Sequence, residues 1–554
     1  TSTEITTRED FEYTAQGRLQ SQTHQINGGT KQLIVKNSYD ELGQLISKKV
    51  GGTDATGATG LQTVDYTYNI RGWLKQINNP TTLGTDLFGF KINYNTVGHG
   101  ATPLYNGNIS ETEWKTQSDN SLRWYKYGYD NLNRITSGID NTADTRYSLS
   151  SVAYDKNGNI TNLTRKGQTN VGATTFGVMD QLTYTYQANS NKLTIVSDAG
   201  NDTFGFKDDQ IGTGTDTTID YTYDVNGNLT TDSNKAITNI SYNHLNLPVV
   251  VNFGSTNKIE YIYDATGVKL QKKVTSGTTI TTDYAGNYIY ENGSLQFFHT
   301  PEGYVEPINA SNYALLFRHT FQYKDHLGNI RLSYKDLNQN TGAISLSIVE
   351  EHNYYPFGLK HNGYNGGTNG QRHHKYMFGG KELQDEIVGS NSFEVYDFGA
   401  RNYDAALGRW MNIDPLAEKM RRHSPYNYAF NNPIYFIDPD GMAPRDIFEI
   451  YRNGDIKKIE QKGEHQVVIM DEEGNRSNIV VNIGENADLV KRSSATLDYN
   501  ILMINDSGKA KDAFKAIAKN TNVEHANITY EDIDGNTKSA IVNNGGIGEV
   551  NGTG

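Results

Sequence analysis

The sequence predicts an all-β fold in which many short hairpins pair into a long sheet that winds on itself. Three observations predict it: a seven-residue motif returns along the chain, alternating polarity leads into each copy, and no long helical period occurs before residue 410. Single hairpins bury little surface, so neighbouring copies must pair to form a continuous core. A repeat on this scale therefore sets the architecture before any single residue is considered.

Each clear copy of the motif begins with Tyr-Asp, carries Gly or Asn near its centre, and ends on an aliphatic residue. The clear copies lie at 39–45, 129–135, 154–160, 223–229 and 263–270. Degenerate copies lie at 13–19, 68–74, 242–247 and 323–331.

The motif is typical of a strand, a tight turn and the start of a return strand. The run from Ile219 to Tyr223 alternates in polarity, as one face of a pleated strand does. The Asp after the Tyr can accept a backbone hydrogen bond two residues on, and Gly or Asn most easily takes the positive φ of a hairpin turn. We therefore interpret the repeat Tyr and Asp residues as structural, without chemistry of their own.

The amino-acid composition excludes several classes of function. Hydrophobic residues make up 36% of the chain and aromatic residues 11%, with 37 Tyr against 19 Phe, which suits a thin-walled sheet with a wet face. The absence of Cys excludes disulfides and thiolate metal sites and is compatible with export. A net charge of −13 argues against a nucleic-acid-binding surface, and no stretch approaches the roughly 20 apolar residues of a membrane span.

We expect three domains: repeats over 1–320, a marker-rich segment over 321–442, and a different C-terminal domain over 443–554. The chain opens on Thr1 inside what reads as a repeat array, without an initiator Met or a signal-peptide pattern. We therefore expect a fragment of a longer polypeptide.

The second segment is dense in aromatic and charged markers that follow a fixed order. These are Tyr323–Arg331, Tyr354–Gly358, Tyr376–Glu382, Tyr396–Asp404, Leu407–Trp410, Asp414-Pro415, Asn431–Pro433 and Asp438–Met442. In content and order they resemble the core segment that ends the arrays of Rhs/YD-repeat proteins, a resemblance that covers roughly residues 10–442. It implies a hollow shell of spiralling hairpins (a β-cocoon), plugged at one end by 321–442, that encloses a C-terminal toxin.

The resemblance also implies an aspartic-type autoprotease. Asp414 and Asp438 match its two carboxylates, Arg401 matches its Arg, and Arg409 is the alternative. Such a mechanism needs two carboxyl groups with separated pKa values, one activating water while the other protonates the carbonyl. We expect cleavage between Met442 and Ala443.

Two features of the motif depart from the family, and a purely structural interpretation stays open beside the catalytic one. The sequence after Asp414 lacks the usual Gly, and Met442 stands where the family has Leu, a similar volume that a Leu-shaped pocket should accept. Asp-Pro also starts turns, so Asp414 and Asp438 could simply shape loops.

After Met442 the sequence predicts a small α+β domain. Its one convincing helix spans 508–519, where Ala510, Ala513, Phe514 and Ile517 share a face.

The stretch 518–525 resembles the opening half of a JAB-like toxin domain, which implies Glu524 as a general base beside zinc. The His-x-His pair of that family is missing, because the tail holds only His465 and His525. We therefore expect an incomplete domain, and we predict no metal and no cofactor for this chain.

The resemblance implies a secreted or cell-surface bacterial protein. Its expected partners are its own toxin domain, delivery or secretion machinery and an immunity protein, with no nucleic acid and no membrane span. The alternative is an adhesin whose Trp73, Trp114 and Trp124 stack on glycans. A nuclease tail ranks lower because residues 471–473 and 531–534 are acidic.

Overall fold

The computed structural model describes residues 4–442, apart from 202, 211–215, 309–316, 340–342 and 363–373, and beyond 442 it describes the backbone of strands only. The chain divides into two compact units, each treated by itself below. The first comprises Thr1–Glu9, Thr23–Val35 and Lys48–Met442; the second comprises Asp10–Gln22, Lys36–Ser47 and Ala443–Gly554.

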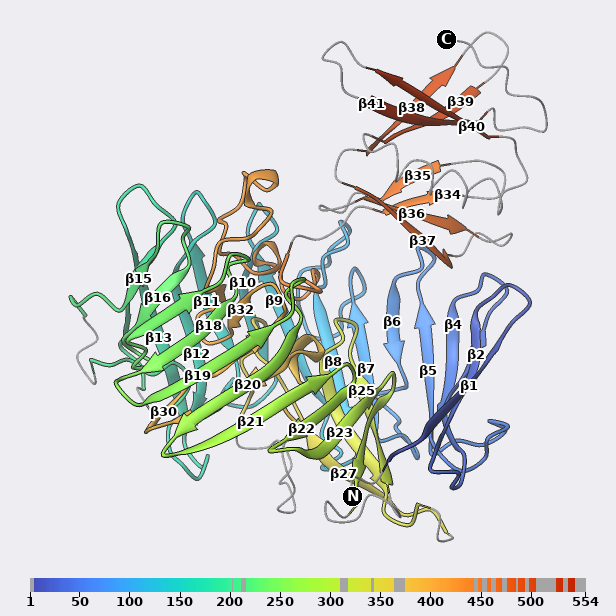
Figure 1. The fold of residues 1–554 in the computed structure, drawn as a ribbon, viewed down its shortest axis with the longest axis horizontal. Helices are drawn as coiled ribbons and strands as arrows, with labels where there is room; N and C mark the ends of the chain where they lie inside the picture. The colour runs from blue at the N-terminus through green and yellow to red at the C-terminus, as the bar shows by residue number, and fades with distance from the viewer. Residues whose placement is uncertain are drawn as a thin grey trace. The chain divides into compact units, whose positions relative to one another are not determined.

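Two large antiparallel sheets, with strands in strict chain order, make up most of the repeat region (Figure 1). The 14-stranded sheet contains β1 (Thr7–Tyr13), β2 (Leu19–Ile26), β3 (Gln32–Tyr39), β4 (Leu45–Val50), β5 (Gln62–Tyr68), β6 (Leu74–Ile77), β7 (Phe88–Asn93), β8 (Glu111–Thr116), β9 (Arg123–Tyr129), β10 (Ile135–Asp140), β11 (Leu149–Tyr154), β12 (Ile160–Gln168), β13 (Phe176–Tyr186) and β14 (Leu193–Asp198). The 11-stranded sheet contains β17 (Asn239–Tyr242), β18 (Pro248–Phe253), β19 (Asn257–Tyr263), β20 (Lys269–Ser276), β21 (Thr278–Ala285), β22 (Tyr288–Glu291), β23 (Ser294–Thr300), β24 (Gly303–Pro307), β25 (Phe317–Lys324), β26 (Ile330–Asp336) and β27 (Leu346–Glu351). A two-stranded sheet, β15 (Tyr221–Tyr223) and β16 (Leu229–Asp232), comes between them in sequence.

The described residues between β27 and Met442 form short strands and turns. A four-stranded sheet has the order β28 (Glu382–Gln384), β31 (Val395–Asp397), β32 (Asn402–Asp404), β33 (Arg409–Trp410), and β29 (Ile387–Val388) pairs with β30 (Asn391–Ser392). Three single-turn 3₁₀ segments are η1 (Phe378–Gly380), η2 (Ala417–Lys419) and η3 (Ala429–Asn431). The described part of the chain contains no α-helix, which confirms the predicted all-β class, and no helix there is long and apolar enough to cross a membrane.

In the second unit the described backbone of the tail forms two four-stranded sheets. The first has the order β35 (Ile456–Ile459), β34 (Ile447–Ile450), β36 (His465–Met470), β37 (Arg476–Gly484), and the second the order β38 (Ala487–Ser493), β39 (Asp498–Ile504), β41 (Thr537–Asn543), β40 (His525–Glu531). The helix expected over 508–519 lies outside the described residues.

The turn chemistry of the motif is as the sequence predicts. In the copy that joins β11 to β12, an oxygen of the Asp155 side chain accepts the backbone N–H groups of Asn157 (2.8 Å) and Asn159 (2.9 Å). Gly158 takes φ 84° in the same turn, a conformation open to residues without a Cβ. The carboxylate thus replaces backbone partners where the chain reverses.

The motif Tyr has a role that the sequence did not reveal. Its hydroxyl donates to the backbone carbonyl of the aliphatic residue that opens the return strand of the preceding hairpin, for example from Tyr154 to Ile135 (2.6 Å). The same link joins two further motif tyrosines, Tyr39 to Leu19 and Tyr242 to Leu229. Three tyrosines outside the motif copies make equivalent bonds: Tyr94 to Leu74, Tyr186 to Ile160 and Tyr354 to Ile330. Burial raises the pKa of Tyr154 well above its usual value, so the hydroxyl stays a donor at every ordinary pH.

Buried ion pairs hold the 382–397 stretch against β20. Lys272 is almost fully buried and lies 2.8 Å from Glu382 and 2.5 Å from Glu386, while Lys269 pairs with Glu382 (2.7 Å) and Asp397 (2.6 Å). Because buried charges are costly without partners, this network fixes one position of the stretch on the sheet.

We predict that Tyr154→Phe lowers the free energy of unfolding by about 1–2 kcal/mol, because it leaves the Ile135 carbonyl without its hydroxyl donor. Urea unfolding of the purified chain measures the change. Tyr105→Phe removes a hydroxyl from a side chain that is 73% exposed and should change stability by less than about 0.5 kcal/mol. Equal effects of the two substitutions would contradict the role given to the hydroxyl link.

Candidate functional site

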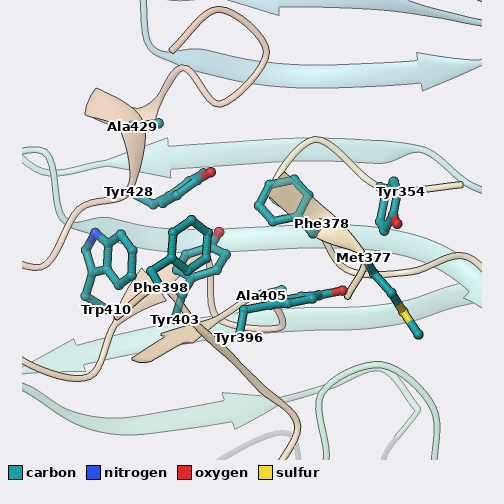
Figure 2. Packing of buried hydrophobic residues seen from close by; sticks show 10 residues of the cluster. All are labelled: Tyr354, Met377, Phe378, Tyr396, Phe398, Tyr403, Ala405, Trp410, Tyr428 and Ala429. Carbon is teal, nitrogen blue, oxygen red and sulfur yellow. The ribbon is translucent and has the colours of Figure 1, made fainter. Parts of the chain in front are cut away.

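The 321–442 segment contains a cluster of buried, mostly aromatic side chains (Figure 2), and the predicted catalytic residue Arg401 stacks on one of them, Trp410. The cluster consists of Tyr354, Met377, Phe378, Tyr396, Phe398, Tyr403, Ala405, Trp410, Tyr428 and Ala429. Ring centroids of Phe398 and Trp410 lie 5.0 Å apart, and those of Tyr403 and Tyr428 lie 4.3 Å apart. We call this set the aromatic cluster; its packed rings give the irregular 382–442 stretch a rigid surface to pack against.

Arg401 is held against this aromatic cluster by its contact with Trp410. Its guanidinium carbon lies 4.1 Å from the centroid of the Trp410 ring, and the residue is 2% exposed. Its Nε donates to the carbonyl of Gly441, and its Nη1 donates to the carbonyl of Pro425 (3.4 Å). Stacking and backbone acceptors together leave Nη2 to face the two carboxyl groups.

Asp414 and Asp438 converge on that one nitrogen. Arg401 Nη2 lies 2.7 Å from Asp414 Oδ2 and 3.1 Å from Asp438 Oδ2, and both carboxyl side chains are about 95% buried. The structure therefore brings together all three residues that the sequence analysis singled out for this site.

The surroundings favour a single proton on the pair at neutral pH. Burial raises the pKa of Asp414, and Arg401 opposes that shift. Burial also raises the pKa of Asp438 to about 7, with further upward contributions from the charges of Asp414 and Asp440. Since Asp414 makes the shorter contact to Arg401, we take Asp414 as the ionised member and Asp438 as the protonated one.

The second oxygen of each carboxyl shapes the local turn. Asp414 Oδ1 accepts the backbone N–H of Leu416 (2.7 Å), and Asp438 Oδ1 accepts that of Gly441 (2.9 Å). Gly441 has φ 78°, and a Cβ there would lie 3.0 Å from the backbone nitrogen of Arg401. The turn-forming and the paired-carboxylate interpretations of these Asp residues are therefore both satisfied, by different oxygens.

Asp440 is a member of the site that the sequence analysis did not assign. Its Oδ1 accepts the backbone N–H of Met442 (3.1 Å), and its carbonyl accepts the N–H of Ala400 (3.0 Å). Met442 itself is 37% exposed. The sequence shows an acidic residue between Pro439 and Gly441. It does not show that this residue hydrogen-bonds to Met442, the residue before the expected cut.

Other candidates do not join this site. Arg409 stacks 4.8 Å from the Tyr426 ring centroid and donates to the Tyr186 hydroxyl (3.3 Å), so it is Arg401 and not Arg409 that contacts Asp414 and Asp438. Ala443 and Glu524 lie outside the described residues, and His465 and His525 are the first residues of β36 and β40 in different sheets.

The tryptophans of the adhesin alternative do not form an exposed row. Trp114 is 3% exposed, with the Arg331 guanidinium 4.9 Å from its ring centroid. The Trp124 ring is covered by the parallel His99 ring at 4.5 Å. The Trp73 ring packs against Tyr94 (centroids 5.3 Å apart) and under the Arg71 guanidinium (5.1 Å). Glycan stacking by these three side chains is therefore not favoured.

Known proteins resemble the chain in part. No family model matches it. It is 28% identical to Salivary gland surface protein 1 of Aedes aegypti over 240 residues (40% of this chain), and 39% identical to Toxin subunit YenC2 of Yersinia entomophaga over 56 residues (10% of this chain). Each match spans 6% of that relative's own length.

Solved structures identify the fold. A crystal structure of TcdB2–TccC3 without its hypervariable C-terminal region superposes with a TM-score of 0.55 at 17% identity, covering 79% of this chain and 20% of that one. The Photorhabdus luminescens Tc holotoxin pore gives 0.50 at 18% identity, covering 78% of this chain and 21% of that one. The chain therefore has the β-sheet fold of Tc toxin shells and spans about a fifth of the length of these neighbours.

We predict that Arg401→Gln lowers the free energy of unfolding by about 3 kcal/mol or more at pH 7, because two buried carboxyl groups lose their cation. Without Arg401 the carboxyl pKa values in the folded state rise further above those of the unfolded state. The variant therefore takes up protons on folding, and its loss of unfolding free energy relative to the wild type becomes smaller toward pH 5. Urea unfolding at both pH values tests this. The exposed Arg421→Gln serves as control, and a pH-independent loss would contradict the paired geometry.

Proposed function

We propose that this chain is part of a toxin shell and cuts itself between Met442 and Ala443 by an aspartic-protease-type mechanism. The observation that carries the proposal is the convergence of Asp414 and Asp438 on Nη2 of Arg401, at 2.7 and 3.1 Å. Two buried carboxyl groups that share one cation can hold a single proton between them, which is the state that hydrolysis by an aspartic pair requires.

In the proposed reaction the ionised Asp414 takes a proton from a water molecule, whose oxygen attacks the carbonyl carbon of Met442. Asp438 gives its proton to the carbonyl oxygen, and a tetrahedral intermediate forms. When the intermediate collapses, the C–N bond to Ala443 breaks, Asp414 passes the proton that it took from water to the Ala443 nitrogen, and a hydroxyl of the intermediate returns a proton to Asp438. The products are a carboxylate on Met442 and an amine on Ala443.

Two contacts position the segment that is cut. Arg401 Nε binds the carbonyl of Gly441, and Asp440 Oδ1 binds the N–H of Met442. The same guanidinium thus contacts both carboxyl groups and the backbone next to the cut, so substrate and catalytic groups are held by a single rigid side chain.

Containment is the role proposed for the cut. The shell keeps residues 443–554 from the producing cell, and cleavage frees this passenger from its covalent tether. The Tc toxin neighbours and the toxin-subunit relative support this role, together with export and delivery proteins as partners. An immunity protein as a further partner stays a prediction. A JAB-like activity of the passenger, with Glu524 as its base, stays a prediction.

We predict that the wild-type chain is recovered as two fragments, whose masses correspond to residues 1–442 and 443–554. Denaturing intact-mass measurement should show that Asp414→Asn and Asp438→Asn each leave a single uncut chain, because either change removes one half of the acid–base pair.

Asp385→Asn, at a side chain that is 37% exposed and paired with Lys375, is the matched control and should be cut like the wild type. An uncut wild type, or a cut Asp414→Asn variant that is stably folded, would overturn the catalytic assignment while leaving the shell fold in place.

A further inference from the structure

The outer edge of β14 is capped by carboxylates. Asp220 Oδ2 accepts the backbone N–H of Val196 (2.8 Å), and Asp208 Oδ2 accepts that of Asp198 (2.8 Å). The described residues between β14 and β15 form no helix or strand. Long irregular connections of this kind are uncommon in compact domains and usually serve a function.

Acidic side chains gather in this connection. Ligand oxygens of Asp208, Asp209 and Asp216 all lie within 4.8 Å of one another. Among the residues that the structure describes, no Lys or Arg forms an ion pair with any of the three. Three carboxylates this close repel one another unless a proton or a cation lies between them.

A fourth carboxyl group supplies an independent observation. Asp220 is 0% exposed, yet its Oδ1 has no hydrogen-bond partner, and it lies next to the Asp216 carboxyl, whose Oδ2 is also buried and unpartnered. The nearby Asn234 amide donates to the Tyr221 hydroxyl (3.1 Å). Two buried carboxyl oxygens that face each other need a positive charge between them, which either a shared proton or a bound cation supplies.

A second group of possible metal ligands, His99, Glu111 and Glu113, differs because its central carboxylate is fully hydrogen-bonded. Both oxygens of Glu111 are satisfied by backbone N–H groups of Gly98, His99 and Ala101 and by the amide of Asn93. That cluster is explained as a loop anchor and needs no ion.

We propose that Asp208, Asp209, Asp216 and Asp220 bind a calcium ion. All four offer hard oxygen donors, which Ca²⁺ prefers, and their irregular arrangement suits the flexible coordination of Ca²⁺ better than the strict octahedron of Mg²⁺. The ion ties the connection to the edge of β14, where one sheet ends and the next begins. This site departs from the sequence analysis, which predicted no metal.

The test is calorimetric titration of the chelator-treated, full 554-residue chain with CaCl₂, followed by thermal unfolding with CaCl₂ or MgCl₂. We expect one saturable Ca²⁺ site and a higher Tm with Ca²⁺ than with equal Mg²⁺. Asp220→Asn should weaken Ca²⁺ binding at least tenfold. Its amide can donate to Asp216, so the variant should remain folded without the ion.

Asp144→Asn is the control, since Asp144 is an exposed carboxylate paired with Arg146, and it should bind Ca²⁺ as the wild type does. A wild type without saturable binding or a Tm shift would overturn the proposal and leave a shared proton between Asp216 and Asp220. Ca²⁺ binding that Asp220→Asn does not weaken would place the ion elsewhere and overturn the site equally.

Discussion

The link between a tyrosine hydroxyl and the backbone of the preceding hairpin is the interaction on which the repeat fold depends. Each motif turn is local, since Asp and Gly or Asn reverse the chain without help from distant residues. Stacking of the turns is not local, and the hydroxyl of Tyr154 on the Ile135 carbonyl is one of a series of equivalent contacts along both large sheets. The series shows how a Tyr-rich chain with few aliphatic residues per strand forms ordered sheets: several neighbouring hairpins are joined by a tyrosine hydrogen bond at a defined register.

The ordered sheets in turn position the irregular 382–442 stretch. Buried ion pairs between Lys272 and its glutamates fix one part of it, and the Tyr184 hydroxyl on the Leu407 carbonyl (3.0 Å) fixes another. The aromatic cluster then holds the Arg401 guanidinium against the Trp410 ring. Since Arg401 contacts two carboxyl groups and the Gly441 carbonyl, the proposed site is assembled without a helix or a long strand, around one guanidinium held in a fixed orientation.

Sequence reasoning succeeded where the determinants are local and failed where they depend on contacts across the fold. The Asp155 turn followed from residue chemistry alone, whereas the hydroxyl partner of Tyr154 lies in another hairpin and left no pattern in its own copy. Asp414 and Asp438 were selected through a family resemblance, because 24 residues of irregular chain separate them and spacing could not place them together. The same resemblance favoured Arg401 over Arg409, and only the structure shows that Arg401 stacks on Trp410 beside the carboxyl groups while Arg409 stacks on Tyr426. The carboxylates around Asp220 were missed because the edge of β14 gathers them, and no spacing rule predicts that.

The pH dependence of the cleavage rate tests the central claim most directly. The chain would be made in a cell-free system, shifted to buffers from pH 5 to 9, and followed by the appearance of the 443–554 fragment. Asp438 must be protonated to act as the acid, and its pKa is raised to about 7, so the rate should fall above that pH. Asp440→Asn removes a charge that contributes to this raised pKa while keeping an acceptor for the Met442 N–H, so the fall should move to lower pH. A rate that is constant across the range, or a fall that Asp440→Asn does not move, would contradict catalysis by the Asp414–Asp438 pair.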